Sequence, residues 1–85
     1  MINRFLEAQK ELYCKNYQKC LALMNFVTMS EEHEQMPTTK IITNILSGFA
    51  NSNTAIVHFL YQKPTLSLSY FTKAKTLLTK ACTGV

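Results

Sequence analysis

The stretch NSNTAIVHFLYQKPTLSLSYFTKA, residues 51–74, contains the spacing that decides the fold. Ser67, Phe71 and Ala74 place a small residue, a large one four positions later and another small one three positions after that. These intervals put all three on one face of a helix. Two antiparallel helices approach to about 8–10 Å only where one side of the crossing is small. Ala55 supplies a small residue on the preceding segment, so the stretch predicts a tight helical hairpin.

The rest of the chain has the same helical period. Apolar residues recur at intervals of three and four, and no sustained alternation typical of a strand is present. We therefore predict an all-α fold with four helices, at about 3–14, 17–29, 39–60 and 65–82. Pro64 ends the third helix, because proline lacks the amide donor and clashes with the preceding turn. Within that helix, residues 47–53 have poor helical propensity and predict some irregularity.

The polar segment SEEHEQMP, residues 30–37, is acidic and ends in proline, which is typical of a linker. It separates a first hairpin at about 3–29 from a second at about 39–82, with the linker itself at about 30–38. A chain of 85 residues makes one small domain, so residues 1–85 are expected to form a single helical-repeat unit.

The two hairpins are loosely related in sequence. A shift of 47 residues, the separation of Ala8 and Ala55, aligns several packing positions and the turn Lys15-Asn16 with Gln62-Lys63. Self-similarity of this kind is typical of helical repeat arrays. The residues expected to pack the two helices of each hairpin are Ala8, Cys20 and Met24 in the first, and Ala55, Ser67, Phe71 and Ala74 in the second.

The small-large-small spacing resembles that of tetratricopeptide repeats, whose period is about 34 residues. Here the acidic linker accounts for the longer period. The quoted stretch, with its Asn51/Asn53 pair, and the segment KNYQKCLALM, residues 15–24, also resemble hairpins of subunit ten of the Ccr-Not mRNA deadenylase complex. The resemblance implies a non-enzymatic scaffold that supports mRNA deadenylation and turnover. It further implies binding to subunit eleven and to the large scaffold subunit of that complex. The odd cysteine count and the lack of a signal peptide separately predict a location in the cytoplasm or also the nucleus.

The first helix of each hairpin has an apolar stripe turned away from its partner helix. An exposed stripe of this kind usually marks an interface. The alternative is that the two stripes bury each other, and the sequence leaves both open. Self-association is a further way to cover them, because fewer than three repeats rarely make a stable array. The predicted contact residues are Ile2, Phe5, Gln9, Leu12 and Tyr13 in the first stripe, and Phe49, Ser52, Ile56, Phe59 and Leu60 in the second.

The charge of the chain is uneven. The net charge is +4, and all five acidic residues precede residue 35. A small basic helical RNA-binding module is therefore an alternative function, and its cations would be Lys63, Lys73, Lys75 and Lys80. No arginine cluster or aromatic platform accompanies these lysines, so we expect a solvated helix face and no direct nucleic-acid binding. The threonines Thr72, Thr76 and Thr79 argue against a membrane-surface helix, and no apolar run approaches a membrane span.

Enzymatic chemistry has no recognisable machinery in this sequence. No His-Glu-x-x-His motif, carboxylate pair or activated nucleophile is present, and His58 is expected to be a packed or partly exposed helix residue. The three cysteines, Cys14, Cys20 and Cys82, form no Cys-x-x-Cys pair and indicate a reduced chain. The sequence predicts no catalytic residue, cofactor or metal.

Overall fold

The computed structural model describes residues 2–31 and 37–83, and within these ranges it contains four α-helices and no strand. The all-α prediction is confirmed, and every helix end lies within two residues of its expected position. The linker predicted at 30–38 is shorter than expected at both ends, and its centre, residues 32–36, lies outside the described residues. The helices are α1 Ile2–Tyr13, α2 Tyr17–Glu31, α3 Pro37–Leu60 and α4 Pro64–Thr83.

The third helix, α3, is continuous over 24 residues, so the irregularity predicted at 47–53 is absent. Small polar side chains there bond to carbonyl groups of their own helix. Asn51 Nδ2 donates to the Ser47 carbonyl at 2.9 Å, and Thr54 Oγ1 donates to the Ala50 carbonyl at 2.8 Å. These bonds satisfy polar groups that would otherwise compete with the helix. Packing on both sides of α3 then outweighs its weak local propensity.

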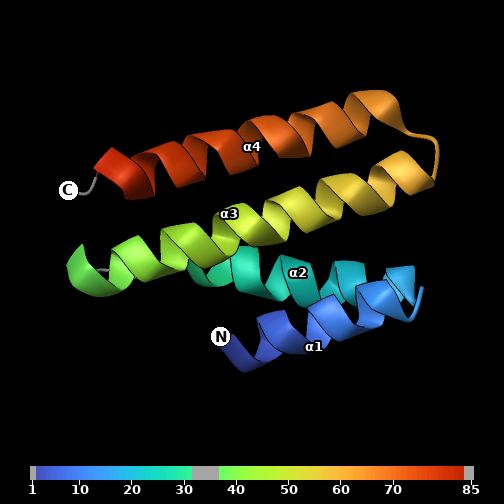
Figure 1. Cartoon of the computed structure of the whole chain (residues 1–85), viewed down its shortest axis with the longest axis horizontal. Helices are drawn as coiled ribbons and strands as arrows, with labels where there is room; N and C mark the ends of the chain where they lie inside the picture. The colour runs from blue at the N-terminus through green and yellow to red at the C-terminus, as the bar shows by residue number, and fades with distance from the viewer. Residues whose placement is uncertain (1, 32–36, 84–85) are drawn as a thin grey trace.

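The helices form a flat array in which α3 is central (Figure 1). One side of α3 packs against α1 and α2, and the other side packs against α4, which runs antiparallel to it. No Cα atom of α1 or α2 lies within 8 Å of a Cα atom of α4. The fourth helix therefore depends on α3 alone for its position, and α3 has two separate flanks that no helix covers completely.

The main hydrophobic core lies between α1, α2 and α3. Phe5 and Leu12 of α1 and Leu21 of α2 pack against its edge and are partly buried. Because this core draws on three helices, it holds the first hairpin to α3. Its fully buried members are Ala8, Cys20, Met24, Val27, Ala50 and Val57.

The contact between α3 and α4 is a close seam of small residues. Ser67, Ala74 and Ala81 recur every seven positions along α4, and all three are buried. Ser67 Oγ donates to the main-chain oxygen of Ala55 at 2.7 Å, which requires the two backbones to lie close together. A seven-residue repeat keeps such a seam facing the partner helix along its length. The predicted close packing of the small residues is therefore confirmed.

Gly48 of α3 makes the seam tighter still. A Cβ added at this position would lie 2.7 Å from Leu78 Cγ and Cδ2, a distance that real Cβ atoms do not tolerate. Leu78 therefore fills the space beside Gly48. Phe71, predicted to fill the corresponding space beside Ala55, lies seven residues before Leu78 and keeps 42% of its surface exposed, so its role stays a prediction.

The predicted duplication is visible in the turns of the two hairpins. Lys15 and Gln62, which the 47-residue shift aligns, both adopt the left-handed conformation, with φ of 66° and 62°. The next amide in each turn, of Asn16 or Lys63, donates at 2.9 Å to the carbonyl five residues earlier. This pattern is a Schellman helix end, which satisfies carbonyl groups left free at a helix terminus. The hairpins thus share a backbone turn as well as a sequence pattern.

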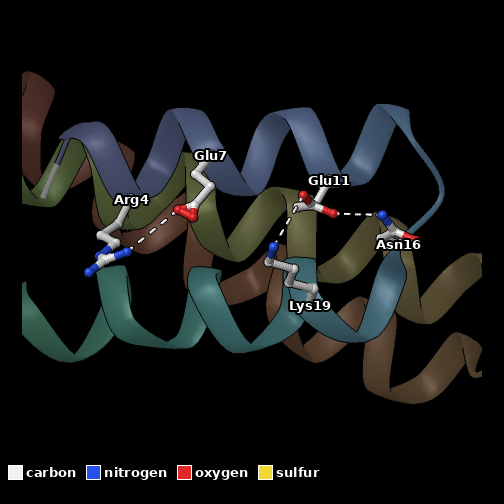
Figure 2. A network of polar contacts seen from close by, with 5 residues as sticks. All are labelled: Arg4, Glu7, Glu11, Asn16 and Lys19. Carbon is white, nitrogen blue, oxygen red and sulfur yellow. Dashed lines mark hydrogen bonds and ion pairs between the residues drawn. The ribbon is translucent and has the colours of Figure 1, made fainter.

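A small polar network joins α1 to α2 (Figure 2). Glu11 of α1 accepts a hydrogen bond from Asn16 Nδ2 at 2.7 Å and lies 3.6 Å from Lys19 Nζ of α2. Arg4 and Glu7 pair at 3.5 Å within α1. The Arg4–Glu7 pair is exposed and adds at most about 1 kcal/mol, whereas the Glu11 side chain keeps only 12% of its surface exposed. The main consequence of both pairs is electrostatic, since Glu7 and Glu11 are paired in the first hairpin, away from α4.

Candidate protein-interaction site

One flank of α3 carries an exposed apolar surface. Ile42, Phe49 and Ile56 recur every seven residues and therefore lie on the same side of the helix. All three are exposed, and Phe49 keeps 47% of its surface in solvent. Phe59 and Leu60 extend the surface at the end of α3, where Phe59 is 66% exposed. We call this surface the apolar face, made of Ile42, Phe49, Ile56, Phe59 and Leu60 of α3 with Ile2 and Tyr13 of α1.

The first helix borders the apolar face and is partly buried against it. The rings of Phe5 and Phe49 lie 6.4 Å apart, centroid to centroid, and Asn53 Nδ2 donates to Gln9 Oε1. These contacts bury part of each predicted stripe against the other. Of the two alternatives that the sequence left open, mutual burial holds for this α1–α3 contact, while much of the apolar surface stays exposed.

The structure therefore divides the predicted contact residues into two groups. Phe5, Gln9 and Leu12 make contacts within the chain, and Ser52 of α3 is half-buried. The exposed group consists of Ile2, Tyr13, Phe49, Ile56, Phe59 and Leu60. Ile42 also lies on this surface, and its seven-residue spacing from Phe49 was the signal that could have added it to the predicted set.

The opposite flank of α3 forms the floor of a polar groove, which the sequence did not predict. Because the backbones of α2 and α4 lie apart, a hollow of about 460 Å³ lies between them. A second hollow of about 210 Å³ shares Asn25, Thr28 and Tyr70 with the first, so the two are adjacent. We call both together the polar groove. It is lined by Leu21, Asn25, Thr28 and Met29 of α2, by Ser47, Asn51, Thr54 and His58 of α3, and by Tyr70, Lys73, Thr76 and Leu77 of α4.

A stripe of polar residues follows α3 beneath this groove. Its members recur at intervals of three and four, the spacing that usually marks an apolar face. Two buried atoms of this stripe, Asn44 Oδ1 and His58 Nδ1, have no hydrogen-bond partner in the part of the chain that the structure describes. Buried polar atoms are ordinarily paired, so these are exceptions that need a physical reason. The stripe consists of Asn44, Ser47, Asn51, Thr54 and His58.

Tyr70 forms the centre of one wall of the groove. Its ring stacks on the imidazole of His58 at 5.2 Å with 20° between the planes, and Lys73 Nζ lies 4.9 Å from the ring centroid. Burial lowers the pKa of His58, and the nearby charge of Lys63 lowers it further. The imidazole is therefore neutral at neutral pH. His58, expected as a packed or partly exposed helix residue, is partly buried and lines the groove.

The lysines of the C-terminal half do not gather on one side of α4. Lys73 lines the groove, and Lys80, seven residues later, lies on the same side of the helix. Lys75 is two positions from Lys73 and therefore projects about 200° around the axis, and Lys63 lies in the preceding turn. The predicted basic residues thus lie on different surfaces of the molecule, and this weakens the RNA-binding alternative.

No family model, curated protein or solved structure matches this chain. Within residues 2–31 and 37–83, no three His, Cys, Asp or Glu side chains come together as a metal site would require. The same part of the chain contains no helix with the length and apolar character needed to cross a bilayer.

Proposed function

We propose that this protein is a non-enzymatic protein-interaction module of helical-repeat type, which binds a partner protein through its apolar face. In the more specific form of the proposal, its hairpins are of tetratricopeptide type. The partners are then subunit eleven and the large scaffold subunit of the Ccr-Not deadenylase complex, and the module supports mRNA deadenylation. The general form is supported by the apolar face, and the specific form by the sequence resemblance alone.

The observation that carries the proposal is the exposure of Phe49, Ile56 and Phe59 along one side of a buried helix. Contiguous apolar side chains of this size usually mark a contact with another macromolecule. Burying one such side chain completely contributes about 1.5–3 kcal/mol. Aromatic residues held in a fixed position are also frequent hot spots of binding. Phe49 is held in this way by its contact with Phe5.

We expect a charge on this face to prevent binding while the fold persists. Phe59→Glu alters a side chain that is 66% exposed, and the double variant Phe49→Glu plus Phe59→Glu alters the centre and the end of the face. Binding to purified subunit eleven and to the purified scaffold subunit would be measured by calorimetry, beside affinity capture from cell extract. We expect Phe59→Glu to weaken binding at least about tenfold, which is about 1.4 kcal/mol.

Leu68→Glu is the matched control for this experiment. Leu68 of α4 is also 66% exposed, but it lies outside the apolar face. This variant should bind and capture as the wild type does, and circular dichroism should show equal helix content for all variants. If the double variant captured the same proteins as the wild type, the apolar face would not be the binding surface. If binding were normal in extract but absent with the two purified subunits, only the specific form of the proposal would fail.

A further inference from the structure

We infer that the polar groove between α2 and α4 is a second binding site, which takes an extended, acidic segment of a polypeptide. This site is separate from the apolar face, because the two lie on opposite flanks of α3. The inference rests on the size of the groove, its polar floor, its length and the one charged side chain among the described residues that line it.

The groove is too large to be a simple packing defect, and about half of its lining is polar. Its larger hollow, about 460 Å³, is in the range typical of ligand pockets, whereas one water molecule takes about 30 Å³ in the liquid. Hydroxyl and amide groups line it from all three helices, including Thr28, Asn51 and Thr76. His58 adds a buried ring nitrogen with no partner in the described part of the chain.

The charge of the groove favours an anionic ligand. Of the described residues that line it, only Lys73 carries a charge at neutral pH, since burial keeps His58 neutral. Glu7 is paired with Arg4 within α1 and Glu11 with Lys19 of α2, and neither glutamate lines the groove. Lys73 is positioned by the face of the Tyr70 ring, and Tyr70 is positioned by its stack on His58. A carboxylate beside Lys73 would gain a charge-assisted hydrogen bond.

The shape of the groove favours an extended chain. Its floor runs along α3 from Ser47 to His58, which corresponds to about 16 Å at 1.5 Å per residue. An extended peptide covers that distance with about five residues. Main-chain amides of such a peptide require both donors and acceptors. The threonine hydroxyls of the groove already donate to carbonyl groups of their own helices and therefore offer acceptors, while the amide groups of Asn25 and Asn51 each keep one further N–H to donate.

A library of acetylated pentapeptides tests this inference. Peptides retained by the immobilised wild-type chain would be identified by mass spectrometry, and the best binders would be measured by fluorescence anisotropy. We expect Asp or Glu to be enriched at one position of the retained peptides. We also expect Lys73→Gln to raise the dissociation constant of those peptides about tenfold, which corresponds to losing one charged contact.

Lys75→Gln is the matched control, because Lys75 is exposed on the same helix and does not line the groove. It should leave the dissociation constant unchanged, as should Phe59→Glu, which separates this site from the proposed function. Three outcomes would overturn the inference. One is retention of no peptides or of neutral peptides only, and another is an equal effect of the Lys73 and Lys75 substitutions. The third is displacement of the peptides by a single-stranded oligonucleotide whose binding is weakened equally by the Lys73 and Lys75 substitutions. That result would indicate an RNA-binding surface.

Discussion

Replacing Met24 by alanine is expected to lower the free energy of unfolding by about 2–5 kcal/mol. Met24 has no exposed surface and packs in the core between α1, α2 and α3. Its truncation removes apolar contacts and leaves a cavity that the neighbouring small residues cannot fill. In a domain of this length, each kcal/mol lowers the melting temperature by roughly 4–8 °C. Urea unfolding followed by circular dichroism would measure the loss.

Phe71→Ala is the informative counterpart, because the 47-residue shift aligns Phe71 with Met24. Phe71 is the larger side chain, yet it is 42% exposed, since α4 packs against α3 alone among the described helices, whereas α2 packs against both α1 and α3. We expect this substitution to cost only about 1–2 kcal/mol. If Phe71→Ala cost as much as Met24→Ala, the flank of α4 would be covered in solution, by self-association or by another part of the chain.

A β-branched residue at Gly48 is expected to have the second large effect. Gly48→Val should destabilise the chain by about 1–3 kcal/mol, although valine favours a helix more than glycine does. The reason is steric, because any Cβ at this position would lie 2.7 Å from Leu78 Cγ. The two helices would have to separate, and the Ser67 hydrogen bond to the Ala55 carbonyl would weaken with them.

Leu78→Ala provides the control for this prediction. In that background the space above Gly48 is free, so Gly48→Ala should stabilise the chain by roughly 1 kcal/mol through helical propensity. In the wild-type background the same Gly48→Ala substitution should not stabilise the chain, because the added Cβ would be too close to Leu78. Equal effects of Gly48→Ala in both backgrounds, measured by thermal unfolding, would show that Gly48 and Leu78 are not in contact.

The sequence predicted the helices well because their determinants are local. Periodicity located all four, the prolines marked two boundaries, and the 47-residue duplication anticipated that both turns would be alike. The same local argument failed at 47–53, where weak propensity indicated irregularity. Apart from Phe49, those residues are small because α3 is packed closely on two sides, and tertiary packing then outweighs propensity.

The surfaces were harder to predict because each depends on which helices touch. The spacing of Phe71 shows which way it points but not whether a neighbour covers it. Likewise, the stripe on α1 was predicted without the register that sets Phe5 against Phe49. The polar groove exists because the backbones of α2 and α4 lie apart. No local sequence pattern predicts the distance between two helices. The sequence feature that could have indicated the groove was the stripe of polar residues on α3, which recur every three or four positions.

A cross-linking measurement tests the central claim, which is the close antiparallel seam of α3 and α4 that separates the two binding surfaces. In a chain with Cys14, Cys20 and Cys82 replaced, Gly48→Cys plus Leu78→Cys would place one sulfur near the present position of Leu78 Cγ, close to the Cβ at residue 48. Mild oxidation should then give an intramolecular disulfide in most molecules with full helix content. The pair Ala55→Cys plus Leu78→Cys, displaced by about 10 Å along α3, should give almost none. Absence of the first disulfide, or equal yields from both pairs, would contradict the seam and the arrangement of both surfaces.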